Sequence, residues 1–177
     1  MKNPILGIIG GGQLGSLLSV AANKIGIKTV ILSDDENAPA KNFTEKFIYG
    51  KYDNKSITQE FIDSVDLVTY EFENIPFNIL QNINNEKTVL PKPEINSLIQ
   101  NRLTEKNFLN DINIQTTQYV SIKHIDELKE NENFLPGLLK TTTLGYDGKG
   151  QYKLNSKKDI SNEIDFSKEY ILEKFIS

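Results

Sequence analysis

The segment Ile5-Leu-Gly-Ile-Ile-Gly-Gly-Gly-Gln-Leu-Gly15 decides how the first part of the chain folds. Residues 5–9 are apolar without alternation, which is typical of a strand buried on both faces of a parallel sheet. Three glycines end this strand, and a helix is predicted from Leu14 to a C-terminal cap at Gly26. A second strand at 29–32 completes a βαβ unit. We expect the helix to bury its apolar stripe, which consists of Leu14, Leu17, Leu18, Ala21, Ala22 and Ile25.

The pattern continues as an open, mostly parallel α/β sheet over the first ninety or so residues. Further strands are predicted at 47–49 and 66–70, with helices at 56–64 and from Pro76. Pro91-Lys92-Pro93 is stiff and extended, so we divide the chain into units 1–93 and 94–177. The second unit is predicted to be α+β with an antiparallel sheet. Its helices are expected at 94–101 and 102–110, and its strands at 119–120, 137–141, 151–154 and 170–176.

Composition narrows the class of protein. At 177 residues and 38% hydrophobic side chains, the chain can bury a core. Its formal net charge of −4 makes nucleic acid a poor candidate partner. The absence of cysteine excludes disulfides and thiolate chemistry, and with no apolar run long enough for a membrane span or a secretory signal, we expect a cytoplasmic protein. The single histidine, His124, lies in a polar stretch and is expected to be solvated.

The first glycine turn fits a dinucleotide-binding fingerprint. Gly10, Gly12 and Gly15 satisfy G-x-G-x-x-G between a strand and a helix, and Asp34 follows nineteen residues after Gly15. Such a turn can hold phosphate on free N–H groups at a helix N-terminus, and it is not specific for NAD. A tight turn without a ligand remains an alternative.

A second glycine-rich loop runs from Lys140 to Gln151 between two predicted strands. It contains three glycines and two lysines, so backbone N–H groups and ammonium charges could converge on an anion. It is not a P-loop, because it leads into a strand and not a helix. An ordinary flexible hairpin is the alternative.

Two carboxylates, Glu71 and Glu73, follow the predicted strand at 66–70. The carboxyl edge of an open α/β sheet is where ligands bind. Alternation predicts both carboxylates on one side, with Phe72 turned inward. They either bind a polar ligand or are solvated.

Five blocks of sequence together resemble the N5-carboxyaminoimidazole ribonucleotide synthetases, an ATP-grasp family. They cover the whole chain in order, and the Tyr-Glu-Phe-Glu-Asn and Gly-Tyr-Asp-Gly-Lys-Gly-Gln stretches are the most specific. The blocks are Ile9–Gly15, Thr69–Pro76, Asn101–Lys106, Leu139–Gln151 and Glu173–Ile176.

The resemblance implies a Rossmann-like pre-ATP-grasp domain followed by the small ATP-grasp lobe and the start of the large lobe. It implies a carbon–nitrogen ligase that uses ATP and bicarbonate to carboxylate 5-aminoimidazole ribonucleotide in purine biosynthesis, releasing ADP and phosphate. Family members are about twice this length. The Mg²⁺ ligands are therefore expected beyond residue 177, the complete enzyme is expected to be a homodimer, and this chain alone is expected to be inactive.

The resemblance also implies site residues, none of which is assigned a catalytic role. The residues matched to ATP binding are Arg102, Lys140, Gly145, Tyr146, Asp147, Gly148, Lys149, Gly150, Gln151, Glu173, Lys174, Phe175 and Ile176. Those matched to the ribonucleotide are Gly12, Gln13, Leu14, Glu73, Tyr146, Asp147 and Lys149.

The chain departs from the family pattern at Ser16, where a basic residue is frequent, and at 142–144, where arginine or glycine is frequent. These departures bear on contacts to the substrate phosphate and on loop geometry. Two other functions stay open. One is a nicotinamide-dependent oxidoreductase that uses the fingerprint glycines and Asp34, and the other is a non-catalytic nucleotide-binding remnant.

Overall fold

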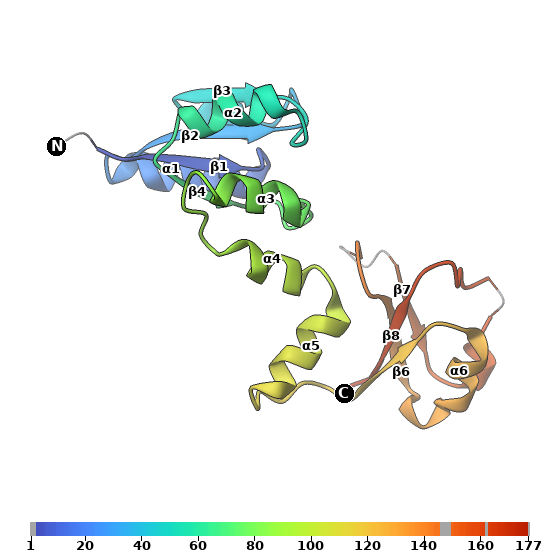
Figure 1. The fold of residues 1–177 in the computed structure, drawn as a ribbon. Coiled ribbons are helices and arrows are strands. Elements are labelled where there is room, and N and C mark those ends of the chain that lie inside the picture. Colours follow the sequence, from blue (N-terminus) through green and yellow to red (C-terminus); the bar gives the residue numbers. More distant parts are fainter. Residues whose placement is uncertain (1–2, 146–149, 162, 177) are drawn as a thin grey trace. The chain divides into compact units, whose positions relative to one another are not determined.

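The computed structural model describes residues 3–145, 150–161 and 163–176 (Figure 1). The chain forms two compact units, Met1–Ser97 and Leu98–Ser177, and the division falls within helix α4 (Pro93–Ile99). The sequence placed the junction a few residues earlier, at the Pro91–Pro93 segment. Among the described residues, no helix is long and apolar enough to cross a membrane.

The first unit is built on a four-stranded parallel sheet, as predicted (Figure 1). Its strands lie in the order β3-β2-β1-β4, so the first strand of the chain is central. Their bounds are β1 (Ile5–Ile9), β2 (Lys28–Ser33), β3 (Lys46–Tyr49) and β4 (Leu67–Tyr70). All four run in the same direction, so their carboxyl ends meet at one edge.

Helices cover both faces of this sheet, which explains why β1 is apolar on both sides. Helices α2 (Lys55–Asp63) and α3 (Phe77–Asn84) pack on the face that carries Ile9. Helix α1 (Gln13–Lys24) and the 3₁₀ helix η1 (Pro39–Phe43) lie against the face that carries Ile8. Ile8 and Ile9 are both fully buried, as alternation along a covered strand requires.

Helix α1 buries only part of the predicted stripe. Ala22 is buried and Leu18 packs against the core, whereas Leu14, Leu17, Ala21 and Ile25 are exposed. Leu14 and Leu17 are 63% and 59% exposed, so the expectation that they pack in the core was wrong. The buried residues of this helix are the small ones, Gly15, Ser16, Ser19 and Ala22. Small side chains let the helix axis approach the sheet closely, which a stripe of leucines would prevent. The predicted C-terminal cap is confirmed, because Gly26 has φ +78° and the following N–H donates to the Ala22 carbonyl.

The second unit is α+β with a four-stranded antiparallel sheet, as predicted, in the order β5-β8-β6-β7. Its strands are β5 (Tyr119–Ile122), β6 (Gly137–Thr141), β7 (Gln151–Leu154) and β8 (Tyr170–Lys174). Its helical elements are α5 (Arg102–Asp111), α6 (Ile125–Glu130), η2 (Glu132–Phe134) and η3 (Lys157–Asp159). Helix α6 was not predicted, because it is short and mostly polar, and His124 is its N-cap residue.

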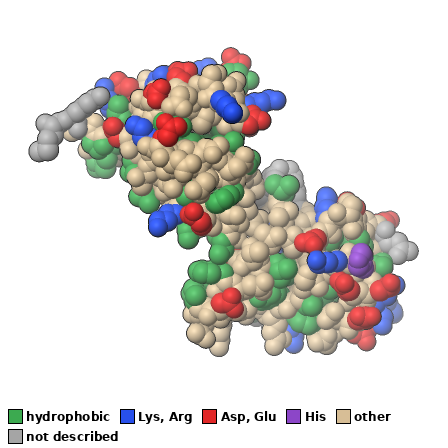
Figure 2. Space-filling model, viewed as in Figure 1, with side chains coloured by type: hydrophobic (Ala, Val, Ile, Leu, Met, Phe, Trp, Pro, Cys, Tyr) green, Lys and Arg blue, Asp and Glu red, His purple; other side chains and the backbone are tan. Residues whose placement is uncertain are grey.

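The two faces of this sheet differ in character. One face carries Leu139, Tyr170 and Leu172, which form a core with Leu128 of α6. The opposite face carries charged side chains, including Lys140 and Glu173. Figure 2 shows acidic and basic side chains interspersed on the visible face of each unit, which agrees with the modest net charge of −4.

Tyr170 should make the stability of the second unit depend on pH at the alkaline end. Its ring is 1% exposed and its hydroxyl donates to the Asp165 carbonyl at 3.0 Å. Burial, with a smaller contribution from Tyr152, raises the pKa of Tyr170 from 10.0 to about 12. Because the unfolded phenol ionises first, the stabilisation is complete below pH 10 and is lost as the pH rises to about 12.

We therefore predict that Tyr170→Phe flattens the fall in unfolding free energy between pH 10 and pH 12. The component removed is on the order of 3 kcal/mol, since one pKa unit corresponds to about 1.4 kcal/mol. Urea denaturation at several pH values measures it, with exposed Tyr49→Phe as the control. Identical alkaline profiles for the two variants would contradict the assignment.

Candidate functional site

Strand register brings several predicted residues to the polar face of the antiparallel sheet. Leu138 lies opposite Glu173, so Lys140, two residues along β6, projects on the same side as Glu173. Gln151 lies opposite Lys140 on β7 and shares that side. The second glycine-rich loop joins β6 to β7, so it begins and ends beside this face.

Glu173 is held between two lysines. Its Oε2 accepts from the Lys140 ammonium at 2.8 Å, and its Oε1 lies 3.4 Å from the Lys106 ammonium. The three side chains are 9%, 25% and 16% exposed, so the carboxylate is largely withdrawn from water and needs these partners. Two positive charges against one negative leave the cluster net positive, which favours an anionic ligand.

Lys106 also ties helix α5 to the sheet. Its ammonium lies 5.5 Å from the centroid of the Tyr119 ring, on β5. The Tyr119 hydroxyl donates to Asn107 at 2.8 Å and accepts from Asn110 at 2.9 Å, both on α5. Tyr119 is directly opposite Glu173 in the β5–β8 register. The helix therefore presents Lys106 to the carboxylate from a fixed position.

Arg102, at the start of α5, binds the backbone where the second glycine-rich loop begins. Its backbone N–H donates to the Thr142 carbonyl at 2.8 Å. In its guanidinium group, Nη1 donates to the Thr141 carbonyl at 3.0 Å and Nη2 donates to the Gly145 carbonyl. Asn101 caps the helix by accepting from two backbone N–H groups. The arginine thus holds the first turn of the loop, and a contact with nucleotide phosphate stays a prediction.

Two described residues of this loop, Gly150 and Leu144, have positive φ angles. Gly150 has φ +69°, and a Cβ there would lie 2.7 Å from the Thr141 hydroxyl, so glycine is required. Leu144, one of the departures from the family pattern, has φ +56° and is exposed. The predicted residues Tyr146, Asp147, Gly148 and Lys149 lie outside the described residues.

The end of β8 completes the polar face. The Phe175 N–H donates to the Pro136 carbonyl at 2.9 Å and the Lys174 N–H to the Gln118 carbonyl at 2.9 Å, so both backbone donors are in use. Lys153 on β7 places its ammonium 4.7 Å from the Phe175 ring centroid. Ile176 is 74% exposed. Lys153 is a further cation on this face that the sequence did not single out.

In the first unit, the glycine turn is occupied by a side chain of the same chain. The Glu71 carboxylate accepts the Gly12 N–H at 2.7 Å. The prediction that Phe72 turns inward was wrong, because β4 ends at Tyr70 and Phe72 is 40% exposed. That Glu71 and Glu73 share one side stays a prediction. Glu73, Gln13 and Leu14 are exposed residues of this unit.

Asp34, the acidic residue of the fingerprint, is also engaged. The Tyr52 hydroxyl donates to its carboxylate at 3.2 Å. Burial, and next the charge of Asp34, raises the pKa of Tyr52, so the phenol stays a donor. One N–H of the glycine turn, that of Gly12, and the acidic side chain of the fingerprint are thus each hydrogen-bonded within the chain.

Comparison with known protein families shows to which family the chain belongs. Residues 1–100 match the family described as the ribonucleotide synthetase preATP-grasp domain. The chain belongs to the family of ribonucleotide synthetase preATP-grasp domains. Residues 107–177 match the ATP-grasp domain, so Lys140 and Glu173 of the polar face lie in the ATP-grasp part of this family member, and Lys106 directly precedes the matched residues.

Related proteins of the preATP-grasp family align along almost the whole chain. The N5-carboxyaminoimidazole ribonucleotide synthase of Staphylococcus aureus strain COL is 34% identical, with 97% of this chain and 47% of that protein covered. A crystal structure of an N5-carboxyaminoimidazole ribonucleotide synthetase in an ADP complex matches with a TM-score of 0.92 and 36% identity, covering 99% of this chain and 48% of the other. The Staphylococcus aureus N5-carboxyaminoimidazole synthetase with ADP matches with a TM-score of 0.92 and 32% identity, covering 100% and 49%. The chain spans about half the length of these relatives.

A magnesium site is not supported by the described part of this preATP-grasp protein. Within residues 3–145, 150–161 and 163–176, no group of three or more His, Asp or Glu side chains could hold a metal ion. The Glu173 carboxylate, which could have served as a ligand, is already paired with two ammonium groups. We therefore derive no step through a metal from these residues.

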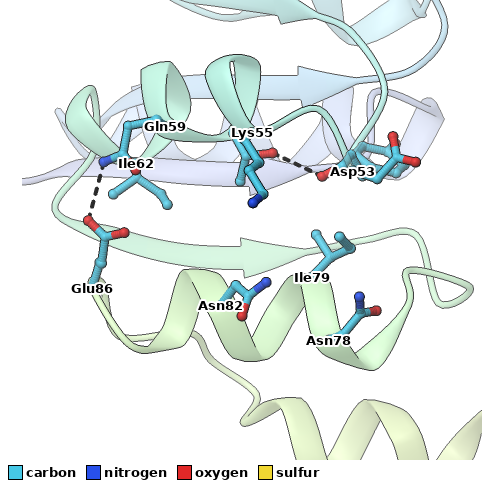
Figure 3. A pocket seen from close by; sticks show the side chains of 10 residues that line it. Asp53, Lys55, Gln59, Ile62, Asn78, Ile79, Asn82 and Glu86 are labelled. Carbon is cyan, nitrogen blue, oxygen red and sulfur yellow. Dashed lines mark hydrogen bonds between the residues drawn. The ribbon is translucent and has the colours of Figure 1, made fainter.

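A half-open groove of about 330 Å³ lies between α2 and α3 in the first unit (Figure 3). Figure 3 shows amide side chains from both helices around it, and a hydrogen bond from Gln59 to Glu86 closes one end. The residues that line it are Tyr52, Asp53, Lys55, Thr58, Gln59, Ile62, Asn78, Ile79, Asn82 and Glu86. The predicted site residues are not among them.

Lys106 is the main site residue that sequence reasoning missed. It was quoted within the Asn101–Lys106 block but was not assigned a role. One signal could have found it, because Lys106 follows Arg102 at the i, i+4 spacing that places two helical side chains on one side.

We predict that Glu173→Gln lowers the unfolding free energy of the second unit by about 1–3 kcal/mol, because two lysines lose their charged partner. Glu169→Gln is a matched control, since its ion pair with Lys123 is more than half exposed and should be worth at most about 0.5 kcal/mol. Urea denaturation compares the two. Equal effects would show that the buried cluster does not stabilise the unit.

Proposed function

We propose that this chain is part of an N5-carboxyaminoimidazole ribonucleotide synthetase. The complete enzyme would use ATP to join bicarbonate to 5-aminoimidazole ribonucleotide, forming N5-carboxyaminoimidazole ribonucleotide, ADP and phosphate in purine biosynthesis. The observation that carries the proposal is the cluster of Lys140, Glu173 and Lys106 beside a glycine-rich loop, in a unit whose residues 107–177 match the ATP-grasp domain. The similarity to relatives solved with ADP supports it.

The cluster suits a nucleotide polyphosphate for an electrostatic reason. Phosphoryl transfer depends mainly on positioning the phosphates and neutralising their charge, and needs little covalent chemistry from the protein. Lys140 and Lys106 supply ammonium donors, while Glu173 fixes where those donors point. Arg102 holds the loop carbonyls, so the loop N–H groups can be presented to the phosphates from an ordered first turn.

The remaining roles follow the resemblance. The exposed strand end at Phe175 and Ile176 would contact adenine and ribose. Gly12, Gln13, Leu14 and Glu73 would contact the imidazole ribonucleotide, and none of these residues is assigned a catalytic role. We further propose Mg²⁺ bound by residues beyond 177, a homodimer for the complete enzyme, and a cytoplasmic location.

We predict that Lys140→Ala weakens ADP binding by the complete enzyme about tenfold or more, because a charge-assisted hydrogen bond is worth about 1.5–3 kcal/mol. Isothermal titration calorimetry measures the affinity. Exposed Lys158→Ala is the control, since it removes the same charge elsewhere in the second unit. An unchanged dissociation constant for Lys140→Ala would remove the polar face from the nucleotide site.

Turnover tests the function itself. The 177-residue chain, incubated with ATP, bicarbonate and 5-aminoimidazole ribonucleotide, should give no sustained phosphate release. The complete enzyme should release phosphate only when all three substrates are present, because carboxylation consumes them together. Sustained release by the short chain, or none by the complete enzyme, would contradict the proposal.

A further inference from the structure

Glu71 enters the glycine turn because of strand register. Strands β1 and β4 are parallel neighbours, with Ile9 opposite Tyr70. The next residue, Glu71, donates its N–H to the Ile9 carbonyl at 2.9 Å. Its side chain therefore starts beside Gly10, at the carboxyl edge where the turn begins.

The carboxylate then meets the start of helix α1. Glu71 Oε1 accepts the Gly12 N–H at 2.7 Å, the short distance typical of a charge-assisted hydrogen bond. Gly12 is the N-cap residue of this twelve-residue helix and has no side chain of its own to cap it. A negative charge at this end is favourable, because the helix dipole is positive there.

The glycines of the fingerprint make room for this side chain. A Cβ at Gly10 would lie 2.7 Å from Glu71 Oε1, and one at Gly12 would lie 3.0 Å from the same atom. Gly10 also has φ +108°, which disfavours any other residue. Gly15 serves a second purpose, since its Cβ would meet the Gly10 carbonyl at 2.7 Å.

We infer that Glu71 is the internal anion of the glycine turn: its carboxylate takes the place of an external phosphate and sets the backbone conformation from Gly10 to Leu14. Glu71 is thus a positioning residue, and the turn does not bind the diphosphate of a dinucleotide. This inference can fail without the ligase proposal failing, although Gly12 and Leu14 of the same turn are proposed to contact the ribonucleotide. It concerns only contacts within the first unit.

The test is an NMR titration of ¹⁵N-labelled chain with inorganic phosphate and with acetate. In the wild-type chain the amides of Gly10, Gly12 and Leu14 should not respond to either anion. In Glu71→Ala these amides should shift from their wild-type positions, and acetate should move them back in a saturable way. Glu45→Ala, which removes an exposed carboxylate from the same unit, should leave the turn unchanged with and without acetate.

Glu71→Gln keeps the shape of the side chain and removes its charge, so the Gly12 amide proton should move upfield while the rest of the unit keeps its spectrum. If Glu71→Ala does not fold, the Gly12 amide shift of Glu71→Gln tests the inference on its own. A saturable phosphate response of Gly12 in the wild-type chain would overturn the inference. So would an unchanged Gly12 amide in Glu71→Gln.

Discussion

A carboxylate withdrawn from water must be neutralised, and around Glu173 this requirement organises the polar face of the second unit. The strand pairing puts Lys140 on the same side of the sheet, and helix α5 supplies Lys106 from outside the sheet. Because Lys106 is also fixed by the Tyr119 ring, the position of α5 depends on the same carboxylate. Arg102 lies one turn before Lys106 on the same helix and binds the backbone where the glycine-rich loop begins. One buried charge thus connects the helix, three strands and the loop.

In the first unit a carboxylate is also stabilised by partners within the chain, but the partners are of a different kind. There the carboxylate of Glu71 is satisfied by a backbone N–H and a helix end, without a lysine. In the first unit an acidic side chain lies where the glycine fingerprint predicts an external anion, and in the second unit an acidic side chain lies between two of the lysines near the predicted anion site. In the second unit the surplus of positive charge leaves capacity for a ligand, whereas in the first unit the Glu71 carboxylate already accepts the Gly12 N–H.

Much of the fold could be predicted from the sequence, because it depends on local patterns. The apolar run of β1 and the glycine at position 26 each fix an element without distant information. The buried face of α1 could not be predicted from apolar periodicity, since close packing there favours Ser16 and Ser19 over Leu17. The direction of Glu71 and the pairing of Lys106 depend on register and on a helix docking on a sheet. Such partners are far apart in the sequence, and no local spacing encodes them.

The Glu71 contact has a consequence for motif searches in other sequences. A scan that scores only the three glycines cannot separate a turn that receives a cofactor from one that receives a side chain. The residue that separates the two cases is the first one after β4, which is the parallel neighbour of β1 on the side away from β2. The register of β1 and β4 places this residue beside the glycine turn. In this chain that residue is Glu71, and its carboxylate already accepts the Gly12 N–H that a cofactor phosphate would need. A scan that also reads this position would test whether the turn has an occupant from its own chain.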